Sequence, residues 1–274
     1  MLITDEEVAV AAAQAGAAVV RAMYGSSLEH FPKDAEHTAG ELAGDFATAA
    51  DIKAESAILG VIRAARPGDA VTGEESGSTG SAGAQRMWLV DPLCGTRNYA
   101  VRNMLVSVNV ALRAGSDVTA AASADPFSGE VFWTDGRHAY VHRDGVDERL
   151  VPSSDSGLVD VNLDPPFPNE PVFRAARLLA DRGFAERFHP RVVSTTLAVA
   201  WVAAGRRAAY VTDGHLEDSV HFAAGIALCR AAGCIVTGIH GQPLHTGTGG
   251  LVAAADQHTH AALLALIAAQ SPPV

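Results

Sequence analysis

Two stretches in the first quarter of the chain place apolar residues at helical spacing, and the same start signal precedes each. Thr4 is followed three residues later by Glu7, and Thr48 is followed three residues later by Asp51. In such a capping box the two residues satisfy free backbone N–H groups of the first helical turn. The pattern predicts one helix from Thr4 to Gly25 and another from Thr48 to a stop at 66–68. The polar residues 26–44 between them are typical of a mobile loop.

Residues 70–151 show the shorter, alternating pattern of strands joined by turns, which favours an antiparallel sheet. Within 106–112, apolar residues alternate with smaller or polar ones, so we expect one buried face there. Residues 76–83 are expected to form a flexible surface loop. The expected strands are 70–72, 87–90, 106–112, 119–123, 130–133, 139–142 and 149–151.

Residues 153–169 are rich in Ser, Asp and Pro, and beyond them helical and strand patterns alternate, which is typical of an α/β layer. We therefore predict an N-terminal α+β lobe over 1–152 and a C-terminal α/β lobe over 153–274. Expected helices are 170–182, 195–204, 219–232 and 257–269. Expected strands are 191–194, 207–212, 234–237 and 250–255.

The composition and net charge of the chain limit the kinds of partner that it can bind. The 274-residue chain is 48% hydrophobic and 19% charged, with a formal net charge of −11, which indicates a globular protein and argues against a nucleic-acid or anionic-membrane surface. The three cysteines form no CxxC pair, and the N-terminus lacks a basic region before its first apolar run. We therefore expect a cytoplasmic protein that acts on small molecules, without nucleic-acid or membrane partners.

Candidate chemistry begins at Asp91, which ends an apolar strand and is followed by Pro92 and by Gly95-Thr96. A carboxylate at this position can bind a cation, and N–H groups at the start of the next helix can hold a phosphoryl oxygen. The same pattern is equally typical of a plain turn. Likewise, Asp51 can be a helix cap alone, and Glu74-Glu75 can be a solvated turn.

Four segments taken together favour the functional interpretation of these residues over a plain turn or helix cap. They are Asp51, the run Gly73-Glu74-Glu75, the run from Asp91 to Thr96 (DPLCGT) and the run from Val220 to Gly225 (VHFAAG). In their order and spacing they resemble the inositol monophosphatase family of magnesium-dependent sugar-phosphate phosphatases, which shows GEE, DPxDGT and WDxAAG. The resemblance covers nearly the whole chain. It implies a layered αβαβα sandwich of two lobes that forms a homodimer.

The resemblance also implies roles for individual residues. Glu74, Asp91 and the backbone carbonyl of Leu93 would bind the catalytic Mg²⁺. Asp51 would pair with Thr96 to orient and deprotonate the attacking water. Independently of the resemblance, the N–H groups of Gly95 and Thr96 at the predicted helix start are expected to contact the phosphate. In the family, the loop that corresponds to 26–44 closes over the site.

Two positions depart from the family pattern. Cys94 replaces the second Asp of DPxDGT, and His221 replaces the Asp of WDxAAG. A thiolate and an imidazole are poor ligands for Mg²⁺, so we expect the family's second magnesium to be lost or replaced. Cys94 can equally be a small buried filler, and His221 a helix-start residue.

Three chemical outcomes follow. The first is an inositol monophosphatase-like hydrolase of a cyclitol, sugar or amino-alcohol phosphate that keeps one Mg²⁺. The second is a site in which Asp91, Cys94 and His221 hold a softer cation such as Zn²⁺. The third is a repurposed non-phosphatase enzyme in which Cys94, with a pKa lowered at a helix start, is the nucleophile and His221 its base, oriented by Glu217 or Asp218. A catalytically silent binding protein is the remaining alternative.

Overall fold

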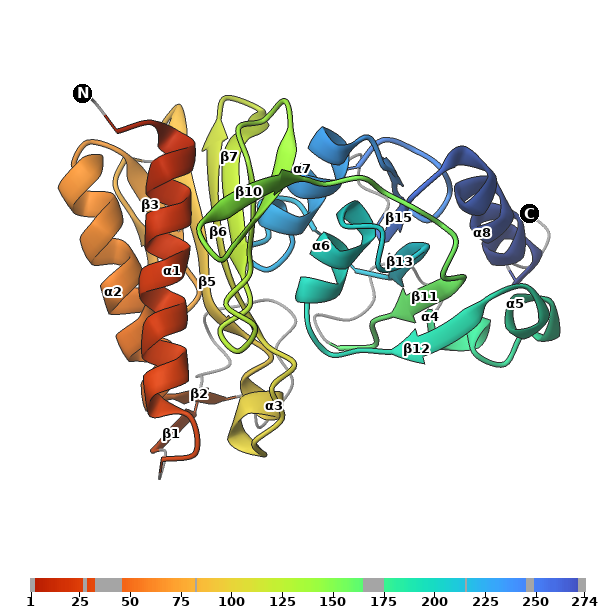
Figure 1. The fold of residues 1–274 in the computed structure, drawn as a ribbon, viewed down its shortest axis with the longest axis horizontal. Helices are drawn as coiled ribbons and strands as arrows, with labels where there is room; N and C mark the ends of the chain where they lie inside the picture. Colours follow the sequence, from red (N-terminus) through yellow and green to blue (C-terminus); the bar gives the residue numbers. More distant parts are fainter. Residues whose placement is uncertain are drawn as a thin grey trace.

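The chain folds into five alternating layers of helices and sheets (Figure 1). The computed structural model describes residues 3–26, 29–32, 46–81, 83–164, 175–214, 216–244 and 249–270. Helices α1 (Asp5–Met23) and α2 (Ala49–Ala65) cover the outer face of the first sheet, and α6 (Leu197–Ala203) and α7 (Ala223–Ala232) lie between the two sheets. The outer layer of the second sheet contains α4 (Ala175–Leu178), α5 (Arg182–Arg187) and α8 (Gln257–Gln270). The αβαβα sandwich is confirmed.

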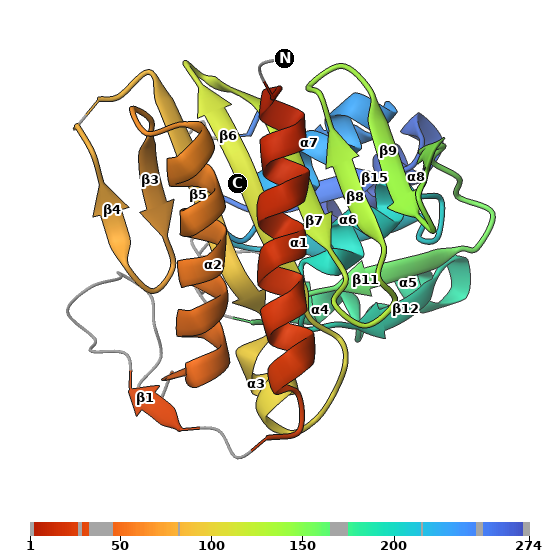
Figure 2. The ribbon, with the colours of Figure 1, turned by 60° about the vertical axis from the view of Figure 1, so that its left-hand side comes forward.

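Both predicted N-terminal helices begin at their capping boxes. The Glu7 carboxylate accepts from the Thr4 N–H at 2.8 Å, and Asp51 Oδ2 accepts from the Thr48 N–H at 2.8 Å. The two helices pack side by side on the sheet (Figure 2). Most of the loop expected over 26–44 lies outside the described residues, but 30–32 form β1 (His30–Pro32), which pairs with β2 (Phe46–Thr48).

The first sheet has, in the described part of the chain, eight strands in the order β10-β9-β8-β7-β6-β5-β3-β4. Every neighbouring pair is antiparallel except β3 and β5, which run parallel. The predicted antiparallel sheet is therefore confirmed for most of its pairs. Its strands are β3 (Ala70–Gly73), β4 (Gly77–Thr79), β5 (Arg86–Cys94), β6 (Ser107–Ala114), β7 (Asp117–Ala124), β8 (Val131–Thr134), β9 (Ala139–Arg143) and β10 (Val146–Arg149).

Two predicted element boundaries in this sheet were wrong. The expected loop 76–83 contains the edge strand β4, all of whose residues are exposed, so no apolar pattern marks it. The strand expected at 149–151 lies earlier, because Asp144 and Gly145 form a two-residue turn between β9 and β10. Both have positive φ, at 51° and 79°, as a tight hairpin requires.

The second sheet has the order β12-β11-β13-β15-β14 in the part of the chain described. β11 is parallel to β12 and β13, while β15 is antiparallel to β13 and β14. The strands are β11 (Leu158–Val161), β12 (His189–Val192), β13 (Ala209–Thr212), β14 (Ile235–Thr237) and β15 (Leu251–Ala254). All strands of the first sheet precede residue 150, but α6 and α7 contact both sheets. The division into two lobes at residue 152 stays a prediction.

Strand β11 was missed, because turn-forming residues surround it and Asp160 interrupts its apolar run. That carboxylate is fully buried and accepts a hydrogen bond from Arg207 Nε at 2.8 Å. The helix expected at 170–182 is also different. Residues 165–174 lie outside the described residues, and α4 and α5 follow as two short helices.

The central strands of the first sheet are buried on both faces, not on one. Val108, Val110 and Leu112 pack beneath α1 and α2. The opposite face of β5 to β7 packs against α7 through Leu89 and Ala111. This second, internal face is where the polar side chains of the site lie.

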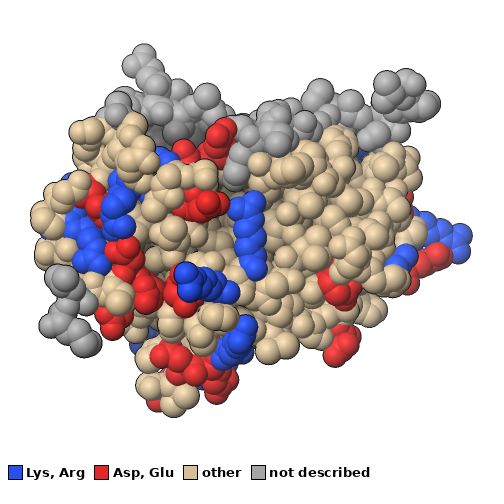
Figure 3. Space-filling model, turned by 90° about the horizontal axis from the view of Figure 1, so that it is seen from above, with Lys and Arg blue, Asp and Glu red and all other residues tan. Residues whose placement is uncertain are grey.

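Charged side chains are unevenly spread on the face seen in Figure 3. Acidic and basic residues are intermixed over the half that carries α1, α2 and the first sheet, and they are sparser over the other half. None of the helices described is long and apolar enough to cross a membrane.

Candidate functional site

The site begins at an irregularity near the end of β5. Asp91 pairs with Asn109 of β6, and Cys94 pairs with Ser107, so two residues of β5 oppose one residue of β6. In a regular strand, side chains three positions apart point to opposite faces. The bulge re-aims the strand so that Asp91 and Cys94 both reach the internal face. Pro92, which has no N–H to donate, lies within it.

His221 contacts Asp91 on this internal face, and Asp91, Cys94 and His221 together form what we call the corner of the site. Its Nδ1 lies 2.8 Å from Asp91 Oδ2, and the Asp91 side chain is fully buried. The helix predicted from residue 219 begins only at Ala223, because residues 219–222 form a turn in which the N–H groups of Phe222 and Ala223 both donate to the Ser219 carbonyl. His221 therefore precedes α7.

Of the two acids expected to orient His221, Glu217 stays a prediction, whereas Asp218 contacts a different residue. Asp218 forms an ion pair with Arg113 at 3.1 Å. Asp91 contacts the imidazole instead, and Glu74 Oε2 lies 3.9 Å from Nδ1. Burial alone would lower the pKa of His221, but Glu74 and Asp91 outweigh it and raise the pKa well above its usual value.

Cys94 lies in the same corner and accepts two hydrogen bonds from one residue. The Thr196 N–H donates to Sγ at 3.4 Å, and Thr196 Oγ1 donates at 3.0 Å. We expected a lowered pKa at a helix start, and this was wrong. Burial raises the pKa of the Cys94 thiol and Asp91 raises it further, against the opposing contacts with His221 and Thr196. The helix that follows, α3 (Thr96–Ala100), is short.

A row of buried polar side chains crosses the sheet behind Asp91. Asp91, Asn109 and Ser123 are cross-strand neighbours on β5, β6 and β7. Ser123 Oγ donates to Asn109 Oδ1 at 2.8 Å, and Asn109 Nδ2 donates to Thr196 Oγ1 at 2.9 Å and reaches Asp91 Oδ2 at 3.4 Å. Asp91 was predicted, but Asn109, Ser123 and Thr196 were not. The available signal was Asn109, a polar residue in the middle of an apolar strand.

Asp51 and Thr96 lie next to this corner. Asp51 is fully buried, its Oδ1 accepts a hydrogen bond from Thr96 Oγ1 at 2.8 Å, and its Oδ2 accepts from the Thr48 N–H at 2.8 Å. Thr96 Oγ1 is also 3.2 Å from the Leu93 carbonyl oxygen. Burial raises the pKa of Asp51 to about 6 despite the hydrogen bonds from Thr48, and the Glu74 carboxylate adds to the rise.

Glu74 is held at the end of β3 by a residue that sequence reasoning missed. The Glu74 N–H donates to the Val90 carbonyl at 3.0 Å. The buried Glu55 carboxylate accepts from the N–H groups of Glu75 at 2.9 Å and Ser76 at 2.8 Å. Glu55 lies one helical turn after Asp51 on α2, and that spacing was the available signal.

Gly95 is required by the turn between β5 and α3. Its φ is +100°, in the left-handed region that favours glycine, and a Cβ there would lie 3.0 Å from the Leu105 carbonyl oxygen. The turn is further fixed by Asn98 Nδ2, which donates to the Leu105 and Ser194 carbonyls, each at 2.9 Å. This ties the segment after Gly95 to the segment that precedes α6.

Comparison with known proteins identifies the family. The model of the inositol monophosphatase family matches residues 3–271. The chain belongs to the inositol monophosphatase family. Membership places it among the metal-dependent phosphatases and confirms the resemblance found in the sequence.

Two sequence relatives and one solved structure show how far this inositol monophosphatase family member resembles known proteins. It is 30% identical over 230 residues to an inositol-1-monophosphatase of Caulobacter vibrioides, covering 81% of this chain and 87% of that protein. It is 32% identical over 227 residues to Nus factor SuhB of Escherichia coli K12, covering 80% and 82%. The crystal structure of the extragenic suppressor protein SuhB from Bartonella henselae superposes with a TM-score of 0.80 at 25% identity and covers 95% and 96% of the two chains.

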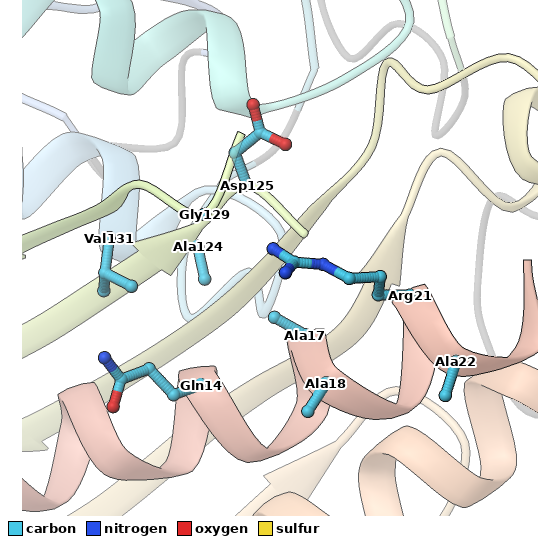
Figure 4. A pocket seen from close by; sticks show the side chains of 9 residues that line it. All are labelled: Gln14, Ala17, Ala18, Arg21, Ala22, Ala124, Asp125, Gly129 and Val131. Carbon is cyan, nitrogen blue, oxygen red and sulfur yellow. The ribbon is translucent and has the colours of Figure 1, made fainter. Parts of the chain in front are cut away.

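A hollow outside this family site is shown in Figure 4. It measures about 310 Å³ and lies between α1 and the turn after β7. Ala17 and Ala18 form part of its wall, and Arg21 extends over it toward Asp125. Arg21 Nε donates to the Pro126 carbonyl, which anchors α1 to the turn. These contacts indicate a structural role for Arg21.

Proposed function

We propose that this protein hydrolyses a small phosphomonoester, such as a cyclitol, sugar or amino-alcohol phosphate. The observation that carries the proposal is the hydrogen bond of 2.8 Å between Thr96 Oγ1 and the buried Asp51 carboxylate, beside the Leu93 carbonyl. A hydroxyl that donates to a carboxylate keeps its lone pairs free to accept a proton from a water molecule. This is the arrangement that a hydrolase needs in order to orient its nucleophile.

The proton path follows from these contacts. As water attacks phosphorus, its proton passes to Thr96 Oγ1, and the hydroxyl proton of Thr96 passes to Asp51. Because the pKa of Asp51 is raised to about 6, its carboxylate is a stronger base than an exposed aspartate, yet it is still mostly ionised near neutral pH. The leaving alkoxide takes a proton from solvent, and the phosphate leaves as inorganic phosphate.

The donor set beside this pair fits one Mg²⁺. The carboxylates of Glu74 and Asp91 and the Leu93 carbonyl are hard oxygen donors, which magnesium prefers, and these three groups would hold the ion. When bound, the ion supplies Lewis-acid activation of water. Asp91 Oδ1 accepts from the Leu93 N–H at 3.1 Å, which fixes the carboxylate next to that carbonyl. The backbone N–H groups of Gly95 and Thr96, at the start of α3, are proposed to contact the phosphate.

The alternative of a metal-free Cys94 nucleophile has weaker support. Nucleophilic attack requires the thiolate, and burial together with Asp91 raises the pKa of the thiol. Iodoacetamide separates the two proposals. A turnover that iodoacetamide abolishes and chelators leave untouched would favour Cys94 as nucleophile.

We also propose a cytoplasmic homodimer, as the family resemblance implies. Val101 and Met104, which follow α3, are 77% and 54% exposed and offer apolar surface for a contact. Light scattering of the purified protein tests the proposal. A monomer at micromolar concentration would contradict it.

The decisive experiment measures phosphate release from a panel of monoesters with Mg²⁺, Mn²⁺ or Zn²⁺. Thr96→Val should lower kcat for the best substrate on the order of 100-fold or more, because it removes the water-orienting hydroxyl. The matched control is Thr134→Val. Thr134 is a threonine of β8, more buried than Thr96, whose Oγ1 donates to the His138 carbonyl instead. No release from any monoester, or equal activity of the Thr96 and Thr134 variants, would refute the proposal.

A further inference from the structure

Three side chains of different chemistry converge at the corner of the site. One ligand atom from each of Asp91, Cys94 and His221 lies within 4.8 Å of the others. Around a tetrahedral zinc ion, neighbouring ligand atoms are about 3.3–3.8 Å apart, given bond lengths of about 2.0–2.3 Å. Asp91 Oδ2 and His221 Nδ1, at 2.8 Å, are slightly closer than this. The limit of 4.8 Å is longer than this spacing and 2.8 Å is shorter, so binding one ion would require side-chain rotations that even out the three separations.

The hydrogen-bond donors behind the corner are directed at Cys94 Sγ and Asp91 Oδ2, where they stabilise negative charge. Ser123 Oγ donates to Asn109 Oδ1, which leaves the Asn109 amide nitrogen to donate to Thr196 Oγ1. Since Thr196 Oγ1 accepts that bond, its own hydrogen is available for Cys94 Sγ at 3.0 Å, and the Thr196 N–H adds a second donor. Asn109 Nδ2 also reaches Asp91 Oδ2. Such donors stabilise a thiolate and a carboxylate, which are the metal-binding forms of these side chains.

From this geometry we propose that Asp91, Cys94 and His221 bind one zinc-class divalent cation through O, S and N. Thiolate and imidazole ligands suit Zn²⁺, whereas Mg²⁺ prefers oxygen. On binding, the thiol proton of Cys94 and the second ring proton of a charged His221 both leave to solvent, so that His221 coordinates as the neutral imidazole. Three protein ligands leave the fourth tetrahedral position open, as in catalytic zinc sites.

Among the described residues, the exposed side of the proposed zinc site is the side of His221. The His221 side chain is 33% exposed, while Asp91 on the opposite side is fully buried. An ion between them would therefore have protein behind it and an open side toward water. If the proposed phosphatase function is correct, a phosphoryl oxygen of the substrate is the ligand expected there, and this detail alone rests on that function.

Asp91 would join the zinc ion to the magnesium site. Its Oδ1 faces the Leu93 N–H at 3.1 Å, and its Oδ2 faces His221 at 2.8 Å. One carboxylate can therefore bind a different cation with each oxygen. Zinc would then lie at the corner where two acids of the family motifs are missing, and the Glu74 and Leu93 oxygens would remain for magnesium.

The test measures metal binding without substrate. The purified full-length protein is dialysed against Zn²⁺, and bound zinc is counted by mass spectrometry and titrated against a chromophoric chelator. We expect one zinc per chain, and on the order of 100-fold weaker binding or worse in Cys94→Ser and His221→Ala. Co²⁺ in place of zinc should give a thiolate-to-cobalt charge-transfer band that Cys94→Ser abolishes.

Matched controls exclude nonspecific effects. His142→Ala removes a histidine of similar exposure, 32%, that also contacts a carboxylate, Asp147 at 3.0 Å. Cys234→Ser removes a buried cysteine outside the site. Both controls should bind zinc like the unmodified chain, and circular dichroism verifies that every variant is folded.

Two results would overturn the proposal. One is the absence of stoichiometric zinc in the unmodified protein, and the other is zinc that persists in folded Cys94→Ser or is lost in Cys234→Ser. Neither result depends on turnover. Failure of the zinc site is therefore distinguishable from failure of the proposed hydrolase function, which phosphate release with Mg²⁺ tests separately.

Discussion

Replacing Thr196 by valine tests whether the buried hydrogen bonds tune the metal site. Valine has nearly the same shape as threonine, so the change removes the hydroxyl without opening a cavity. It deletes the 3.0 Å bond to Cys94 Sγ and the acceptor of the 2.9 Å bond from Asn109 Nδ2. The Thr196 N–H, 3.4 Å from the sulfur, remains. The thiolate would therefore keep the weaker of its two donors.

The expected magnitude follows from these bonds. A hydrogen bond to a charged group contributes roughly 1.5–3 kcal/mol, and loss of a comparable outer contact weakens metal binding by about 10–100-fold. We expect the zinc affinity of Thr196→Val to fall within that range, measured by competition with a chromophoric chelator. Asn109 Nδ2 would keep only its longer contacts, to Ser107 Oγ at 3.3 Å and Asp91 Oδ2 at 3.4 Å, so the free energy of unfolding in urea should also fall by about 0.5–1.5 kcal/mol.

The neighbouring threonine provides the control. Thr195 is as buried as Thr196, but its Oγ1 accepts from the Leu197 N–H at 3.3 Å. Thr195→Val should therefore leave zinc affinity unchanged. Equal zinc affinity in the two variants would refute the reasoning that Thr196 supports the sulfur.

Three further predictions test the account elsewhere. The double variant Cys94→Asp/His221→Asp should raise magnesium affinity roughly tenfold or more in a phosphate-release titration, because it restores two oxygen ligands; no gain in a folded variant would contradict this. Glu130 has a lowered pKa because two arginines bind it, so its stabilisation is present above about pH 4.3, its unfolded pKa, and is lost as pH falls through the lower folded value. The free energy of unfolding in urea should therefore fall more steeply between about pH 5 and pH 3 for the unmodified chain than for Glu130→Gln; equal slopes would argue against this pH dependence. Gly225→Ala would place a Cβ 2.8 Å from Val199 Cβ and should cost about 1–3 kcal/mol of unfolding free energy, whereas unchanged stability would show that α6 and α7 can move apart.

The sequence predicted those parts of the site that depend on local signals. The Thr48–Asp51 capping box fixes the start of α2, and the same Asp51 carboxylate then reaches Thr96. The sequence marks the strand that carries Asp91 and the turn at Gly95, but the expected strand end at Pro92 was wrong, because β5 continues through a bulge to Cys94. These features rest on backbone chemistry that adjacent residues determine.

The remaining features depend on contacts between distant segments. Thr196 donates a hydrogen bond to Cys94, 102 positions away in the sequence, and no local sequence pattern predicts that bond. The burial of Asn109 depends on α7 covering the second face of the sheet. The raised pKa of Cys94 likewise reflects burial and Asp91 rather than the helix start beside it. The family resemblance brought the motifs together but could not supply these contacts, because Cys94 and His221 are the two positions that depart from it.

The most direct test of the account is a crystal structure of the protein grown with Zn²⁺ and measured at the zinc absorption edge. We predict an anomalous peak between Asp91 Oδ2, Cys94 Sγ and His221, with bond lengths of about 2.0–2.3 Å. A data set without a peak at this corner, or with zinc only at other residues, would contradict the central claim.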